Sequence, residues 1–346
     1  MIELVEELFS DEEAWIVGGA VRDHALDRPI VDVDVAVREP ERAARVYARR
    51  SGGVPFQLSE RHGAWRVALE EGRTVDFTPL PASIEHDLAT RDFTINAIAE
   101  RVGSDEAVDP FDGYGDLGAN RIRAVSDSVF ADDPLRLLRA VRLEDELPFG
   151  FRMTPETESL LREHAHLVDR PAGERVLDEL LRLSPWGYRR LVELGLLERL
   201  GGRMDERLER VDSPEFRLVA SFGEQLRRLP ISNELRRYAR TLLAAERPPD
   251  ASARSIHRFR RQTEPWALDA LAFVGADELA EAVRNAREHD PAEPLVRGDE
   301  LGLPPGPEIG RLLAEIEEER AAGTITTKEQ ALEYARRHTD ALRSDG

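Results

Sequence analysis

Two aspartates stand two residues apart in the alternating run Asp32-Val33-Asp34. Successive residues of a β-strand face opposite sides, so both carboxylates would point the same way, with Cα atoms about 6.6 Å apart. Val31, Val33 and Val35 would then face the core. Two carboxylates this close repel each other, and a divalent cation between them relieves the repulsion; oxygen ligands favour Mg²⁺. Taken alone, such a pair is more often only the acidic solvent side of a strand.

A glycine pair precedes these aspartates, because the run from Gly18 to Asp23 reads Gly-Gly-Ala-Val-Arg-Asp. Small residues where a strand passes into a helix let backbone amides approach phosphate oxygens, and the helix N-terminus adds favourable polarity. We therefore expect Gly18, Gly19 and the charge of Arg22 to cradle a triphosphate. Asp76, in a second strand pattern, would supply a third carboxylate to the same face. Its alternative role is a charge at the edge of a hairpin.

The elements that must position these groups fall into two classes along the chain. The first part predicts a strand over 31–37, a helix over 40–50, a hairpin over 64–70 and 73–78, and a turn with a β-rich stretch over 87–98. From about residue 127 the apolar period becomes 3.6, which predicts helices over 133–143, 155–168, 171–183 and 186–200. We expect an α+β chain with a mixed head over 1–126, a helical neck over 127–200, and a helical body and tail over 201–346.

Four blocks of the sequence match a known family in their order and approximate spacing. They are the segment 18–34 described above, Arg-Asp-Phe-Thr-Ile-Asn-Ala at 91–97, Asp-Asp-Pro-Leu-Arg-Leu-Leu-Arg-Ala at 132–140, and Glu-Arg-Val-Leu-Asp-Glu-Leu at 174–180. With them the sequence resembles the class II, bacterial-type family of tRNA nucleotidyltransferases and poly(A) polymerases, and within it a CCA-adding enzyme. The resemblance covers about residues 14 to 200 and is weaker beyond. It implies a polymerase-β-like nucleotidyltransferase head followed by an all-helical neck, body and tail.

The resemblance also implies an activity. Such an enzyme adds C and A to the 3′ end of tRNA from CTP and ATP, without a template and with release of pyrophosphate. Asp32 and Asp34 would hold two Mg²⁺ ions, with Asp76 as the third catalytic carboxylate. The block at 91–97 would sense the ribose, since its polar side chains can bond the 2′-hydroxyl. The matching residues are Arg91, Asp92 and Asn96.

The block at 132–140 would read the nucleotide base. Asp133 and Arg136 are spaced i, i+3 at the start of an expected helix, so we expect them on one face. The carboxylate can accept from the exocyclic amine of C or A while the guanidinium donates to ring acceptors; U and G present the wrong pattern. Asp132 would orient Arg136, and Arg139 continues the basic side of the helix. The alternative is an acidic helix start with a local salt bridge.

Two departures from the family bear on specificity. Thr90 stands where many relatives have a second arginine before Arg91. The stretch from Phe77 to Thr90 has only 14 residues, whereas relatives that add the whole CCA usually carry a longer loop there. A partial CC-adding or A-adding enzyme is therefore the alternative. A poly(A) polymerase ranks behind it, because such relatives tend to carry basic extensions that this chain lacks.

By itself the composition argues against a nucleic-acid partner, because the 346 residues carry a net charge of −20. Of the 48 basic residues, only Lys328 is a lysine. RNA contact is expected in the segment 236–261, which contains eight arginines and only two acidic residues. A solvated helix face is the alternative reading of this segment. The expected RNA-binding residues are Arg236, Arg237, Arg240, Arg254, Arg258, Arg260 and Arg261.

Other compositional features narrow the class of protein. Cysteine is absent, which excludes disulfides and thiolate metal sites. No apolar run approaches the roughly 20 residues of a membrane helix, and the acidic start does not fit a signal peptide. We therefore expect a cytoplasmic protein with no membrane partner. A metal phosphohydrolase is disfavoured because the dipeptides His86-Asp87 and His289-Asp290 lack further histidines at helical spacing. A non-catalytic RNA-binding module would be expected to have lost one of the paired aspartates.

Overall fold

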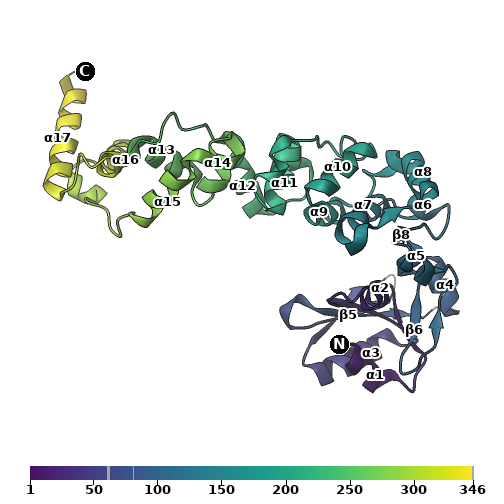
Figure 1. The fold of residues 1–346 in the computed structure, drawn as a ribbon. Coiled ribbons are helices and arrows are strands. Elements are labelled where there is room, and N and C mark those ends of the chain that lie inside the picture. Colours follow the sequence, from purple (N-terminus) through teal and green to yellow (C-terminus); the bar gives the residue numbers. More distant parts are fainter. Residues whose placement is uncertain (61–62, 81, 345–346) are drawn as a thin grey trace. The chain divides into compact units, whose positions relative to one another are not determined.

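The computed structural model describes residues 1–60, 63–80 and 82–344. The chain divides into two compact units, Met1–Gly201 and Gly202–Gly346. The first contains a β-sheet and a group of helices, and the second is helical. The expected α+β class is confirmed (Figure 1).

A seven-stranded sheet forms the first half of the first unit, in the order β3-β4-β5-β2-β1-β6-β7. β2 and β5 are parallel, and the other neighbours are antiparallel. The expected strand over 31–37 and the hairpin over 64–78 are confirmed as β2 and as β4 with β5. The strand bounds are β1 (Ala14–Val17), β2 (Asp32–Val37), β3 (Val54–Ser59), β4 (Ala64–Ala68), β5 (Thr74–Pro79), β6 (Ala99–Arg101) and β7 (Ala107–Val108).

Helices α1 (Ile2–Phe9) and α3 (Pro40–Ser51) cover one face of this sheet. On it the Phe77 ring lies 5.6 Å from the Phe9 ring and 5.8 Å from the Tyr47 ring. Val33 and Val35 are fully buried in the same layer. The expectation for Val31 was wrong: it precedes the strand and is 50% exposed.

Helices α2 (Gly19–Ala25) and α4 (Ile84–Ala89) pack over part of the opposite face. Figure 1 shows α2 across the sheet from α1 and α3. Trp15 and Val17 of β1 join Ile84 and Leu88 of α4 in one apolar cluster. Val17 pairs with Asp34 in the β1–β2 register, so this cluster lies on the face that carries Asp34.

The segment 87–98 does not form the β-rich stretch that its composition suggests. α4 ends at Ala89, and a 3₁₀ turn, η2, spans Thr94–Asn96. The Asp92 carboxylate accepts hydrogen bonds from the Phe93 backbone N–H at 2.8 Å and from the Asn96 side-chain amide at 2.9 Å. Such local bonds are the usual way that Asp and Asn favour turns, and strand pairing here is limited to one antiparallel bridge between Phe93 and Ala124.

The rest of the first unit is helical apart from one short parallel strand pair, β8 (Arg121–Ile122) with β9 (Arg152–Met153). α7 packs against α9 and α10. Arg142 of α7 donates to Glu179 of α9 at 2.6 Å, a buried bond between helices. The helices are α5 (Gly113–Gly118), α6 (Val129–Asp132), α7 (Arg136–Glu146), α8 (Pro155–His164), α9 (Gly173–Leu181) and α10 (Pro185–Glu193).

Seven α-helices are present among the described residues of the second unit, joined by loops and 3₁₀ turns. They are α11 (Pro214–Phe222), α12 (Asn233–Ala244), α13 (Ala253–Thr263), α14 (Ala267–Val274), α15 (Ala280–Glu288), α16 (Pro307–Ala321) and α17 (Lys328–Ser344). Ser213, Ser232 and Ser252 cap the N-termini of α11, α12 and α13 by accepting backbone N–H groups. Within the described ranges, no helix has the length and apolar character needed to cross a membrane.

Candidate functional site

Asp34, Asp76 and Arg66 lie side by side on three neighbouring strands. The register pairs Asp34 of β2 with Asp76 of β5, and Asp76 with Arg66 of β4. Directly paired residues face the same side of a sheet. Arg66 donates from Nε to Asp76 Oδ1 and from Nη2 to Asp76 Oδ2, both at 2.7 Å. Asp32 lies on the same face, and its Oδ1 accepts from the Thr74 hydroxyl at 2.7 Å.

The pKa of Asp34 depends on its burial and on four charged neighbours. Burial raises the pKa of Asp34; Arg91 and Arg139 act against this rise, whereas the charges of Asp76 and Asp32 add to it. The hydrogen bond to Asp76 raises the pKa of Arg66, which therefore remains a cation beside the three acids. An added positive charge at Asp32 and Asp34 would stabilise both ionised carboxylates.

The donor set at this place suits a hard divalent cation. Asp32 and Asp34 offer only oxygen atoms, the ligands that Mg²⁺ prefers. Among the described residues no group of three or more His, Asp or Glu side chains is arranged as a metal site. Asp76 is turned instead to Arg66. Asp32 and Asp34 are therefore the residues that could hold such a cation.

Gly18 forms the tight junction between β1 and α2. Its φ of +73° lies in the region that favours glycine. A Cβ at this position would lie 2.4 Å from Arg91 Nη1, so a side chain would displace that guanidinium. Arg22, one turn further along, is buried and donates to Asn96 Oδ1 at 2.6 Å and to Asp23. In this arrangement Arg22 ties α2 to η2.

A cavity of about 280 Å³ opens beside Asp34. Eight of its lining residues were expected from the sequence to bind the nucleotide or the metal: Gly19, Asp34, Arg91, Asp92, Asn96, Asp133, Arg136 and Arg139. Asp87 and Thr90 were missed. Asp87 could have been found from its i, i+4 spacing to Arg91, which donates to it at 2.9 Å. Gly18, Arg22, Asp32, Asp76 and Asp132 do not line this cavity.

Asp92 is the buried anchor of the cavity wall. Arg139 Nε lies 2.7 Å from Asp92 Oδ2 in an ion pair. Burial alone would raise the pKa of Asp92, but Arg139, the Asn96 amide and the Phe93 N–H together hold it below its ordinary value. Asp92 therefore stays ionised and positions both Asn96 and Arg139.

Asp133 and Arg136 line the same cavity, but they do not share a helical face as expected. α7 begins only at Arg136, and Asp133 is extended, with φ −142° and ψ 99°. The expectation that both lie on one helical face was wrong, because Pro134 disfavours a helical conformation at the residue before it. Arg136 donates to the backbone carbonyls of Thr90 at 2.7 Å and Val129 at 3.3 Å.

The acidic neighbours of Arg136 have other partners. Asp133 accepts from Arg175 at 2.8 Å, and its pKa is lowered because that bond and others outweigh its desolvation. Asp132 accepts from the Ser128 hydroxyl at 2.7 Å. Asp132 therefore does not orient Arg136 here, contrary to the expectation, since the turn of α6 directs it to Ser128.

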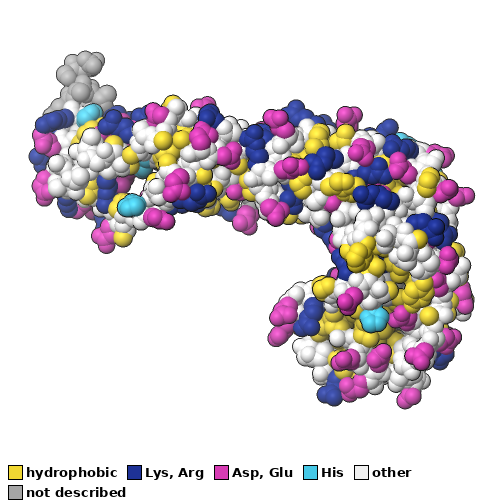
Figure 2. Space-filling model, viewed as in Figure 1, with side chains coloured by type: hydrophobic (Ala, Val, Ile, Leu, Met, Phe, Trp, Pro, Cys, Tyr) yellow, Lys and Arg dark blue, Asp and Glu magenta, His cyan; other side chains and the backbone are white. Residues whose placement is uncertain are grey.

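The arginines of 236–261 differ in their surroundings. On α13, Arg254 pairs with Glu319 and Arg258 with Glu318, both acids coming from α16. On α12, Arg237 and Arg240 are exposed and, among the described residues, have no ion-pair partner. Figure 2 shows acidic and basic side chains interspersed along this unit. Counting charges along the sequence missed the acids that α16 supplies.

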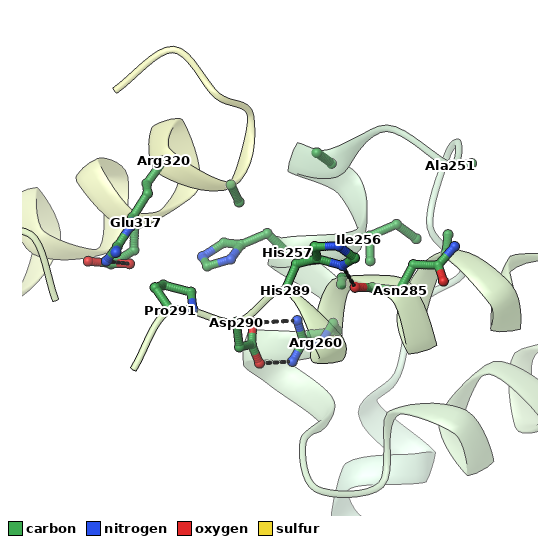
Figure 3. A pocket seen from close by; sticks show the side chains of 14 residues that line it. Ala251, Ile256, His257, Arg260, Asn285, His289, Asp290, Pro291, Glu317 and Arg320 are labelled. Carbon is green, nitrogen blue, oxygen red and sulfur yellow. Dashed lines mark hydrogen bonds and ion pairs between the residues drawn. The ribbon is translucent and has the colours of Figure 1, made fainter. Parts of the chain in front are cut away.

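Arg260 lies in the wall of a second cavity, of about 550 Å³, wholly within the second unit. Figure 3 shows its guanidinium paired with Asp290, with His257 and His289 nearby. Arg236 donates to Asn233 at 2.6 Å, and Arg261 is exposed. The smaller cavity beside Asp34 is the stronger candidate site, because charged groups from three chain segments converge on it.

Family models and known relatives match this chain. Residues 14–80 and 66–123 match the model of the poly(A) polymerase head domain, and residues 150–201 match a probable RNA- and SrmB-binding site of polymerase A. The chain is 31% identical to the A-adding tRNA nucleotidyltransferase of Deinococcus radiodurans over 94% of this chain and 95% of that protein.

Two further comparisons concern half of the chain and the whole fold. The CC-adding tRNA nucleotidyltransferase of Geobacter sulfurreducens is 47% identical over 173 residues, which is 49% of this chain but only 40% of that protein. The CCA-adding enzyme of Thermotoga maritima, solved in complex with tRNA, superposes with a TM-score of 0.73 over 97% of this chain and 93% of that one, at 22% identity. That likeness shows a common fold.

Proposed function

The chain belongs to the tRNA nucleotidyltransferase family, and on that premise we propose that it adds C and A to the 3′ end of tRNA. The substrates would be CTP and ATP, pyrophosphate would leave, and no template would be read. The observation that carries this proposal is the open cavity beside Asp34, because the Asp34 carboxylate and the polar side chains proposed to read the base line it together. Its volume, about 280 Å³, is near the lower end of small-molecule sites.

The reaction joins the RNA 3′-oxygen to the α-phosphorus of the nucleotide. The bond from that phosphorus to the bridging oxygen breaks, and pyrophosphate leaves on the opposite side. Asp32 and Asp34 would hold Mg²⁺, two ions by family resemblance. When bound, the metal lowers the pKa of the attacking hydroxyl and neutralises charge on the phosphates. Asp76, held by Arg66, would supply the third carboxylate of the site.

The nucleotide would lie with its triphosphate toward the start of α2 and its base toward α7. Gly19 lines the cavity at this junction and is proposed to present its backbone amide to phosphate oxygens, whereas the Gly18 amide donates to the Ile98 carbonyl at 3.2 Å. Arg91 adds a charge at the same end, and Arg22 is proposed to support this junction. Asp92 and Asn96 would receive the ribose 2′-hydroxyl.

Base selection is proposed for the far end of the cavity. Arg136 would donate to ring acceptors and Asp133 would accept from the exocyclic amine of C or A. Arg139 completes the proposed set through its pairing with Asp92. The neck, 127–200, would thus read the base while the head, 1–126, performs the transfer. The body and tail, 201–346, would hold the tRNA through exposed arginines.

A CC-adding enzyme is the second candidate. It is favoured by the short segment from Phe77 to Thr90, of which residue 81 lies outside the described residues. The CC-adding relative that is 47% identical over half of the chain supports the same candidate.

The deciding experiment uses three tRNA substrates, ending at the discriminator base, at C and at CC. Each is incubated with CTP alone, ATP alone or both, and product length is read at single-nucleotide resolution. Addition of C, C and then A supports the main proposal, whereas products that stop at CC support the second. A long A tract, or no product in any lane, would overturn both. Asp32→Ala serves as the inactive control.

A further inference from the structure

Strand β3, at the edge of the sheet, exposes three large apolar side chains at alternate positions. Val54, Phe56 and Leu58 are 65%, 43% and 46% exposed. We call these three residues the β3 stripe. Exposed apolar side chains on an edge strand invite association with other molecules, so the stripe is a candidate docking surface.

The register places Val54 and Phe56 of this stripe on the same face as the catalytic carboxylates, while Leu58 lies at a β-bulge between Gln57 and Ser59 and has no paired residue. Phe56 pairs with Arg66, Arg66 with Asp76, and Asp76 with Asp34. A second row runs from Val54 through Ala68 and Thr74 to Asp32. Neighbouring strands are about 4.8 Å apart, so Phe56 lies roughly 10 Å from Asp76 and roughly 14 Å from Asp34 along the sheet.

The two sides of this face offer different surroundings. Beyond Asp34, toward β1, the face is covered by Ile84 and Leu88 of α4, and the nucleotide cavity lies there with Thr90 and Arg91 in its wall. Toward β3 the side chains of the β3 stripe are exposed and Arg66 is partly exposed, whereas Asp76 is buried. The attacking and leaving oxygens of phosphoryl transfer must lie in line, on opposite sides of the α-phosphorus. A nucleotide seated in the cavity therefore leaves the β5-β4-β3 side to the RNA 3′ end.

We propose that the β3 stripe is a stacking platform for the last unpaired bases of the RNA 3′ end, with Phe56 as its aromatic member. This inference rests on the proposed function. Every base has an apolar π-face, so a platform of this kind tolerates C or A and needs no hydrogen-bond code. At two to three strand spacings from the carboxylates, it would hold nucleotides just before the reacting terminus and steady the 3′-hydroxyl at Asp32 and Asp34.

The test compares Phe56→Ala with wild type in single-nucleotide addition to an RNA minihelix. We expect the KM for the RNA to rise about fivefold to a hundredfold, the range for losing one base–aromatic stack, while the KM for CTP stays within twofold. Phe56→Tyr should restore the wild-type value. Phe149→Ala, which removes an exposed phenylalanine from a turn in the helical part of the same unit, is the matched control and should change neither constant.

A second readout does not depend on turnover. A minihelix with 2-aminopurine before its last nucleotide should lose fluorescence on binding wild type, and Phe56→Ala should abolish that quenching. If wild type adds nucleotides and Phe56→Ala leaves both the KM for the RNA and the quenching unchanged, this inference alone is overturned. A wild type that adds nothing to RNA would overturn the proposed function instead. A dimer in sedimentation velocity that Phe56→Ala dissociates would assign the stripe to protein association and also overturn the inference.

Discussion

Arg66 donates one hydrogen bond of 2.7 Å to each carboxylate oxygen of Asp76 across the β4–β5 pair. The pair lies in line with Asp34 on the open part of the sheet. A bidentate arginine fixes the plane of a carboxylate as well as its charge. We infer that Arg66 is a positioning residue, which keeps Asp76 directed along the sheet while substrates arrive.

Removing Arg66 should therefore impair transfer more than nucleotide binding. For Arg66→Ala we expect kcat to fall about tenfold to a hundredfold, the cost of a lost charged contact of roughly 1.4–2.7 kcal/mol. The KM for CTP should change less than threefold. Arg66→Lys should recover part of kcat, since a lysine keeps the charge and loses the fork. Steady-state kinetics on an RNA minihelix measures both constants.

The matched control for Arg66 is Arg45 of α3, which packs against the other face of β4. Arg45 stacks over the Trp65 ring, at 5.0 Å from its centroid. Arg45→Ala removes a guanidinium close to β4 without touching the carboxylates, so its kcat should match wild type. An equal fall of kcat in both variants would show that β4 was merely disturbed and would contradict the role given to Arg66.

Asp92 should make the free energy of unfolding depend on pH. Its pKa is lowered in the folded chain, so its contribution is complete above the ordinary Asp value of about 4 and is lost as the pH falls through the lower, folded value. Asp92→Asn should cost about 1–3 kcal/mol at pH 7, less than for a fully buried pair because the Arg139 side chain is 40% exposed. Urea unfolding at pH 7, 4 and 3 measures this.

The difference between wild type and Asp92→Asn should shrink on acidification, because the protonated carboxyl of wild type then resembles the amide. The exposed Asp105→Asn is the control and should track wild type at every pH. A difference that stays constant from pH 7 to pH 3 would show that Asp92 contributes packing rather than charge.

Arg136 should govern the choice of base. Its guanidinium lines the cavity and contacts backbone carbonyls, without an acidic partner within ion-pair distance among the described residues. Loss of a base-reading contact costs about 1–3 kcal/mol of discrimination. We therefore expect Arg136→Ala to lower the preference for CTP over UTP by roughly fivefold to a hundredfold, measured as a ratio of kcat/KM. Arg182→Ala, at a surface arginine paired with Glu146, should leave that ratio unchanged.

The exposed arginines of α12 should contribute to tRNA affinity through charge. Each phosphate contact adds roughly 0.7–0.9 to the slope of log K against log salt. The double variant Arg237→Ala/Arg240→Ala should reduce that slope by about 1 to 2 in filter binding with full-length tRNA. Arg254→Ala/Arg258→Ala removes equal charge from arginines already paired with α16. This second pair should lower the melting temperature and leave the slope near wild type.

Local alternation in the sequence predicted β2 and its shared carboxylate face, apart from Val31, whereas contacts between residues distant in the chain were not predicted. The strand 31–37 and the face shared by Asp32 and Asp34 follow from a period of two. Arg66 gave no signal, because its meeting with Asp76 depends on the register of a hairpin. The pairing of Arg258 with Glu318 joins residues 60 apart in the chain. The conformation of Asp133 could have been foreseen from Pro134, a restriction that helical spacing alone conceals.

The row Phe56–Arg66–Asp76–Asp34 also sets where the chain can change its length. An insertion or deletion of one residue within β4 would turn Arg66 to the face of α3 and bring Trp65 or Val67 against the carboxylates, since side chains alternate. The turn at Glu70–Gly72 connects β4 to β5 outside the paired residues and can absorb such a change. Length variants in the evolution of this sheet should therefore gather at its turns, and those within β4 should be inactive even where they fold.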